Sequence, residues 1–78
     1  MCIRDRGSAY YYNGLANTEK GSYQDAIISL ELVLMMSSHD PGLLRSAYNA
    51  LGETYKKLEK FDLSEDAFNQ AKVIKPKG

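Results

Sequence analysis

The chain has 78 residues, which is enough for one small domain at most, and its 44% hydrophobic content is ordinary for a soluble globular protein. Ten basic residues balance ten acidic ones, so no net charge attracts nucleic acid or an anionic membrane surface. A single cysteine, Cys2, excludes an internal disulfide and a multi-thiolate metal site. No apolar run approaches the roughly 20 residues that span a bilayer, so we expect no membrane span.

The first six residues, 1–6, do not share the pattern of the remaining chain. They have no helical period, and they can be back-translated into a string that resembles the end of a transposase adapter used for DNA libraries. We expect residues 1–6 to be an artefact of such an adapter, with a genuine short tail as the alternative, and we leave them out of fold reasoning. Any export signal would then lie upstream, so the sequence does not distinguish a cytoplasmic from a periplasmic protein.

Two helices are predicted in the first half of the chain. A thin stripe of Tyr10, Gly14 and Asn17 indicates the first, and Gly21 can end it in a left-handed cap. Ser22 with Asp25 resembles a capping box that opens the second helix. The second helix has an apolar stripe at spacings of three and four, made of Tyr23, Ala26, Ile27, Leu30 and Leu34.

Two more helices are predicted in the second half. Asp40 before Pro41 is typical of an N-cap followed by proline at the first helical position. Asp62 with Glu65 offers a capping pair for the fourth helix, and Pro76 ends it. The third helix carries an apolar stripe of Leu44, Ala47, Tyr48, Leu51, Tyr55 and Leu58. The fourth carries Phe61, Ser64, Phe68, Ala71 and Ile74. Short turns make neighbouring helices antiparallel.

The two halves are related by one constant offset, which pairs Gly14 with Gly52 and Leu30 with Phe68. The second copy has an aromatic residue, Leu-Gly and Tyr, followed by an aromatic residue, a small residue, a second aromatic residue, Ala and Pro. These positions are Tyr48, Leu51, Gly52, Tyr55, Phe61, Ser64, Phe68, Ala71 and Pro76. This pattern resembles the tetratricopeptide repeat, and the first copy matches it more weakly because Asn17 replaces the usual tyrosine. The resemblance is to bacterial-type arrays.

The resemblance implies an all-α fold, in which two antiparallel helix-turn-helix repeats, residues 7–40 and 41–78, stack as an α-solenoid. Since the usual repeat has about 34 residues, the longer offset between the two copies leaves extra residues. We place them at Pro41 to Leu44 as one added helical turn, with a longer loop over residues 37–42 as the alternative. Small residues are expected at the closest helix approaches, Gly14 beside Ala26 and Gly52 beside Ser64. Because two repeats leave both ends uncovered, further repeats of the same chain are expected on both sides.

By the same resemblance, the first helices of the two units line a concave groove that binds a peptide or helix of a partner protein. The groove candidates are Tyr11, Tyr12, Leu15, Asn49, Glu53 and Lys56, together with Ser8, Thr18 and Lys57. Tyr11 and Tyr12 are either anchors for the partner or packing residues for an upstream repeat. Chaperone-binding members of this family grip a terminal carboxylate at these places, and Glu53 would repel one.

A second apolar stripe on the predicted second helix consists of Ile28, Leu32, Met35 and Met36. We expect it to be buried against the following repeat, with an adaptable binding surface as the alternative. No phosphate-binding loop, metal motif or catalytic constellation is present, and the adjacent Ser38, His39 and Asp40 do not form a triad. We therefore expect no enzyme activity and no cofactor. The alternative function is a regulatory or sensory segment of a larger enzyme or transcription regulator.

Overall fold

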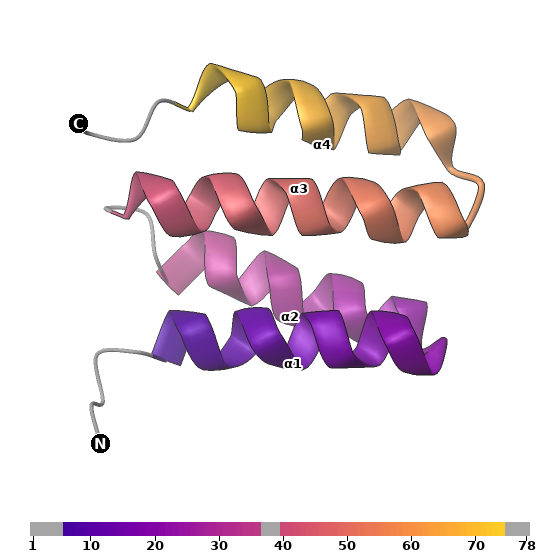
Figure 1. The fold of residues 1–78 in the computed structure, drawn as a ribbon, viewed down its shortest axis with the longest axis horizontal. Helices are drawn as coiled ribbons and strands as arrows, with labels where there is room; N and C mark the ends of the chain where they lie inside the picture. The colour runs from indigo at the N-terminus through magenta and orange to yellow at the C-terminus, as the bar shows by residue number, and fades with distance from the viewer. Residues whose placement is uncertain (1–5, 37–39, 75–78) are drawn as a thin grey trace.

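Four α-helices form the structure, a computed structural model that describes residues 6–36 and 40–74. They are α1 (Arg6–Lys20), α2 (Tyr23–Met36), α3 (Pro41–Lys57) and α4 (Phe61–Val73), and the described residues contain no strand. Successive helices run antiparallel, so α1 and α3 begin at the same end of the molecule (Figure 1). The all-α prediction of two helix-turn-helix units is confirmed. Cys2, His39 and Pro76, and with them residues 1–5 of the expected artefact, lie outside the described residues.

The first helix of each hairpin ends in the same hydrogen-bonded turn. In the first hairpin, Ser22 N–H donates to the Asn17 carbonyl at 2.8 Å and Gly21 N–H donates to the Thr18 carbonyl at 3.1 Å. The pattern is a Schellman motif, and it requires a left-handed residue, here Gly21 with φ +88°. The second hairpin repeats it at the equivalent positions: Lys60 N–H donates to Tyr55 and Glu59 N–H to Lys56. There the left-handed residue is Glu59, with φ 62°.

Helix starts follow the predicted signals at α3 and differ from them at α4. The Asp40 carboxylate accepts from the Leu43 N–H at 3.3 Å, and Pro41 is the first residue of α3, so residues Pro41 to Leu44 form its first turn. The predicted capping pair of Asp62 and Glu65 is wrong, because α4 begins one residue before Asp62 and its N-cap, Lys60, makes no side-chain cap bond. Asp62 instead lies in the first turn, where a carboxylate interacts favourably with the helix dipole.

Each hairpin packs its own two helices together, and α3 joins the hairpins. α1 packs on α2 and α4 packs on α3, while α3 also packs on α2 and touches α1; the described part of α4 packs on α3 alone. The core cluster contains Leu30, Ala50, Leu51 and Ala67, which come from α2, α3 and α4. Half-buried apolar side chains of α1, α2 and α3 surround the cluster. They are Tyr11, Leu15, Ile27, Leu34, Tyr48 and Tyr55.

The closest helix approaches occur at the two equivalent glycines. A Cβ atom on Gly14 would stand 2.7 Å from Leu30 Cγ, and one on Gly52 would stand 2.7 Å from the Phe68 ring. The second approach is also fixed by a hydrogen bond, because Ser64 Oγ donates to the Gly52 carbonyl at 2.8 Å. In the first hairpin the Ala26 carbonyl oxygen lies 3.4 Å from the same Cβ position on Gly14. The expected small-residue approaches are therefore confirmed, with a large side chain of the returning helix filling each glycine notch.

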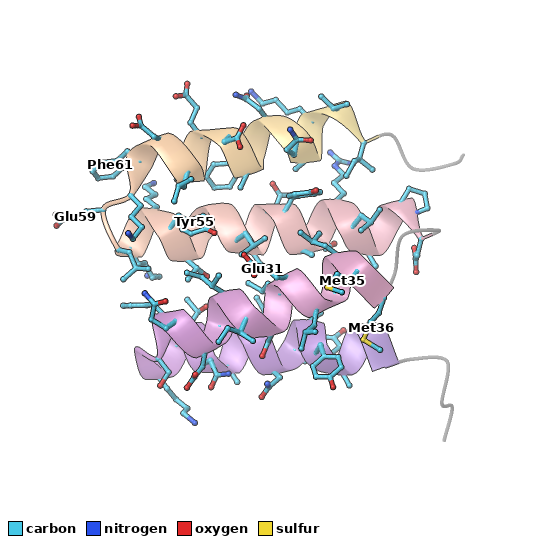
Figure 2. All side chains as sticks on the ribbon, turned by 180° about the vertical axis from the view of Figure 1, so that it is seen from behind. Glu31, Met35, Met36, Tyr55, Glu59 and Phe61 are labelled. Carbon is cyan, nitrogen blue, oxygen red and sulfur yellow. The ribbon has the colours of Figure 1, made fainter. Side chains whose placement is uncertain are left out.

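The outer face of α2 differs from the prediction. Ile28 and Met35 remain 57% and 75% exposed although the second hairpin is in place. The expectation that the following repeat buries this stripe is wrong for both residues. The reason is helical geometry, since Ala26, Leu30 and Val33 face the interior and leave Ile28 and Met35 on the opposite side of the helix. Figure 2 shows Met35 and Met36 at the end of α2.

Replacing Gly14 by alanine should destabilise the fold. The added methyl group would overlap Leu30, which is fully buried and cannot move aside. Overpacking of this kind costs about 1–3 kcal/mol, which outweighs the roughly 1 kcal/mol that alanine gains over glycine inside a helix. Urea denaturation should show a lower free energy of unfolding. The control is Gly42→Ala, where the nearest atom lies at an ordinary 3.7 Å and the fold should gain up to about 1 kcal/mol. A stabilising Gly14→Ala would contradict the close approach.

Replacing Glu59 by glycine should stabilise the second hairpin. A non-glycine residue in the left-handed region costs about 1–2 kcal/mol, and the added flexibility of glycine in the unfolded chain offsets roughly half of this gain. We expect the free energy of unfolding to rise by about 0.5–1 kcal/mol. The matched change, Gly21→Ala, places a Cβ at the equivalent turn and should lower it by about 1 kcal/mol. If both variants shift stability in the same direction, the two turns are not equivalent.

Candidate partner-binding surface

The first helices of the two hairpins, α1 and α3, touch along one seam. Thr18 Oγ1 and Thr54 Oγ1 form a hydrogen bond of 2.9 Å across this seam. Each hydroxyl also lies within hydrogen-bonding distance of a carbonyl oxygen in its own helix, Thr18 of Gly14 at 3.0 Å and Thr54 of Ala50 at 2.9 Å. Because each hydroxyl carries one proton, only one of them donates to its carbonyl while the other donates across the seam. Thr54 is fully buried. The two threonines therefore fix α1 against α3 through a polar contact in which one hydroxyl donates across the seam, and the hydroxyl that accepts this bond donates to the carbonyl of its own helix.

The candidate residues of α1 divide into two kinds. Tyr11 and Leu15 are half-buried and pack against the core cluster, so they form the base of the surface beside α3. Tyr12 is 65% exposed. The Tyr12 ring lies beside that of Tyr11, with a centroid distance of 5.3 Å and an interplanar angle of 60°. Such a tilted aromatic pair is a favourable arrangement, and it supports the exposed Tyr12 ring from one side.

The candidate residues of α3 are all exposed. Asn49, Glu53 and Lys56 follow one another at spacings of four and three, which places them on one face of α3, away from the buried Ala47, Leu51 and Thr54. Lys56 additionally lines a hollow of about 460 Å³ between α3 and α4. The hollow is otherwise lined by α4 residues, namely Phe61, Ser64, Glu65, Phe68, Asn69 and Lys72. Lys56 is thus shared between the α3 face and the α4 side.

A second hollow, of about 180 Å³, was not predicted from the sequence. It lies between α2, α3 and α4, and its lining includes Glu31, Tyr48, Tyr55 and Asp66. Helical spacing predicts that both tyrosines belong to the apolar stripe of α3, but both are only half-buried. Periodicity locates such residues on the inner side of a helix, but it does not indicate that a gap between two neighbouring helices leaves part of each ring accessible.

Tyr55 is the titratable group whose ionisation this hollow perturbs. Partial burial raises the pKa of its phenol above the ordinary 10.0, and the nearby negative charge of Glu31 raises it further. Both effects disfavour the phenolate. Glu31 belongs to α2 and Tyr55 to α3. Figure 2 views the molecule from the side on which α2 lies in front of α1, and it shows both residues on these neighbouring helices. The second hollow therefore carries a negative potential at its α2 edge.

No group of three or more His, Cys, Asp and Glu side chains in residues 6–36 and 40–74 has the geometry of a metal site. None of the helices in this part of the chain is long and apolar enough to cross a bilayer.

The comparison with known families identifies the second hairpin. Residues 46–77 match the model of the tetratricopeptide repeat family. The match spans most of α3 and all of α4, and it begins after the first turn of α3. The protein therefore contains a tetratricopeptide repeat, a non-catalytic unit that generally mediates protein–protein interaction. Comparisons with curated proteins and with solved structures found no match.

Removing the charge of Glu31 should lower the pKa of Tyr55. In Glu31→Gln the Coulombic contribution disappears while burial remains, so the pKa should fall but stay above 10.0. Because the folded-state pKa is raised, this group favours the folded state below pH 10.0, and the contribution is lost as the pH rises through the folded pKa. NMR titration of ring-labelled tyrosine measures the change directly. Asp25→Asn, on the first turn of α2, is the control, and an equal shift there would contradict a specific Glu31 effect.

Proposed function

We propose that the α1–α3 face binds an extended peptide or a helix of a partner protein, as an assembly module. The observation that carries this proposal is the fixed seam between the two helices, with Tyr12 exposed beside it and Asn49 and Glu53 exposed on α3. Rigid elements position recognition groups better than loops, because less conformational entropy is lost when the partner binds. The family match supports the coarser function of protein–protein interaction.

The side chains of this face define what kind of segment it accepts. Tyr12 offers a large amphipathic ring, a residue type common among the strongest contacts of interfaces. Asn49 can both donate and accept hydrogen bonds to a peptide backbone. Glu53 is exposed on the same face of α3 and repels a carboxylate. A neutral or basic internal segment of the partner therefore suits the face better than an acidic chain terminus.

Further helical units of the same chain are a second proposed occupant of the molecule, on its α4 side. The hollow around Phe61 and Phe68 is the counterpart, in the second hairpin, of the surface of the first hairpin on which α3 rests. A following helix with apolar residues toward both rings would cover it. The alternative function is a regulatory segment of an enzyme or transcription regulator. No described feature favours it over an assembly module.

Peptide selection provides the test of the α1–α3 face. A display library of random peptides is selected on the protein, and the affinities of the recovered peptides are measured by calorimetry for the unchanged chain and for Tyr12→Ala. Loss of a buried aromatic contact typically costs about 2 kcal/mol or more at an interface hot spot, which is a weakening of about thirtyfold. Glu53→Gln should strengthen acidic peptides relative to neutral ones.

The control for this selection is Gln70→Ala on α4, an exposed position that lines the other hollow. It should leave the affinities unchanged. If the recovered peptides bind Tyr12→Ala as tightly as the unchanged chain, or lose affinity in Gln70→Ala instead, the α1–α3 face is not the binding surface. Circular dichroism of each variant shows whether the helices remain intact.

A further inference from the structure

The second hollow lies away from the α1–α3 face, and its boundaries are three helices. Glu31 and Leu34 come from α2, and Tyr48, Leu51 and Tyr55 come from α3. Leu63, Asp66, Ala67 and Gln70 come from α4. No described residue of α1 contributes, so a molecule in this cleft would not compete with one bound at the α1–α3 seam. We call this hollow the α2–α4 cleft.

The chemistry of the α2–α4 cleft is an apolar base beneath acidic edges. Leu51 and Ala67 are almost completely buried and belong to the core, so they close the bottom of the cleft. The two half-buried rings of Tyr48 and Tyr55 line the α3 wall. Glu31 and Asp66 are exposed carboxylates on the opposite edges, one from α2 and one from α4. Among the described residues that line the cleft, none is basic.

Exposed apolar side chains flank the cleft on the α2 side. Ile28 precedes Glu31 by three residues and Met35 follows it by four, so the three side chains form one stripe along the outer face of α2. Ile28 and Met35 are mostly exposed. The residue equivalent to Ile28 in the second hairpin is Asp66. An exposed apolar residue at this position is therefore a feature of the first hairpin and not a requirement of the repeat.

We propose that the α2–α4 cleft receives a lysine or arginine side chain from a helical segment of a partner protein, whose flanking apolar residues rest on Ile28 and Met35. The aliphatic stem of a long cationic side chain matches the Leu51 and Ala67 base, and its charged end meets the carboxylates at the rim. The tyrosine rings add a cation–π contribution. This partner surface is separate from the α1–α3 face of the proposed function.

Charge complementarity distinguishes this occupant from a second copy of the chain. In an antiparallel contact between two α2 helices, the apolar stripes would meet, but the Glu31 carboxylates of both copies would then approach each other near its centre. The two negative charges would then repel each other. The described part of α2 contains two acidic residues, Asp25 and Glu31, and no basic residue that could offset this repulsion. A basic amphipathic helix of a partner brings a positive charge close to Glu31, so this repulsion does not arise.

The test uses a synthetic helix as the probe. An acetylated and amidated peptide of alanine and glutamine carries one lysine, with a leucine three residues before it and another four residues after it, and a lactam bridge on its far side holds it helical. Its affinity for the protein is measured by NMR titration, following the Tyr55 ring and the Leu63 methyl groups. A matched peptide has norleucine in place of the lysine, which preserves the four-carbon chain and removes the charged ammonium group.

We expect the lysine peptide to bind at least about tenfold more tightly than the norleucine peptide, and its affinity to fall as salt is added. Glu31→Gln and Asp66→Asn should each weaken it, and the double variant should remove the preference for lysine. Glu19→Gln, which removes an exposed carboxylate from α1, should leave the affinity unchanged. A binding defect confined to Tyr12→Ala would belong to the α1–α3 face and would overturn the assignment to this cleft.

Three other results would also overturn the proposal. Equal affinity for the two peptides would show that the stripe binds apolar side chains without reading charge. Absence of shifts at Tyr55 and Leu63 with the lysine peptide at millimolar concentration would show that the cleft does not accept it. Concentration-dependent self-association of the protein that Met35→Gln abolishes would show that the stripe contacts a second copy. Met35 and Glu31 are exposed, so these variants should keep their fold.

Discussion

The close contact of a glycine with a large side chain of the returning helix sets the geometry of both hairpins. Because Gly14 and Gly52 have no Cβ atom, Leu30 and Phe68 pack directly against the backbone of the neighbouring helix. Glycine inside a helix is unfavourable by about 1 kcal/mol relative to alanine, and the packing gained at these two notches offsets that cost. The distances between α1 and α2 and between α3 and α4 both depend on a missing side chain, because Gly14 and Gly52 occupy equivalent positions of the two hairpins.

The central position of α3 follows from this packing and separates the two proposed binding surfaces of the molecule. α3 contacts α1 through the paired threonines, α2 through the core cluster and α4 through the Gly52 notch. Its Asn49 and Glu53 point to one side of the molecule, and Tyr48 and Tyr55 line a cleft between its other two neighbours.

Local chemistry explains which parts of the fold could be predicted from the sequence. Gly21 and the Asp40-Pro41 pair act through bonds within a few residues, and the structure has the expected cap at both places. The Glu59 turn was not predicted because no glycine marks it; its conformation is imposed by the helices it connects. The capping prediction for Asp62 was wrong because Asp62 already lies inside α4, although its spacing to Glu65 fits that of a capping pair.

The candidate sites were predictable to a smaller extent, since they depend on how helices are placed relative to one another. The family resemblance implied that Tyr11 and Leu15 lie on the groove side of α1, but it could not show that both would pack against the core beside α3. Spacing likewise could not reveal the α2–α4 cleft, whose walls come from residues 31 to 70 and meet only after both hairpins have docked. The exposure of Ile28 and Met35 depends in the same way on which side of α2 the second hairpin occupies.

The packing of α4 against α3 alone makes this helix the element whose detachment disrupts the fewest interfaces. In stacked repeats, stability is approximately a sum of nearest-neighbour interfaces, so among the described helices the one with a single interface opens in a partial unfolding event of lower free energy than global unfolding. Opening of α4 would remove one wall of the α2–α4 cleft while leaving the α1–α3 seam intact. A ligand held between α2 and α4 would therefore act as a clasp, protecting the amide protons of α4 from exchange with solvent, whereas a ligand on the seam would leave them unprotected.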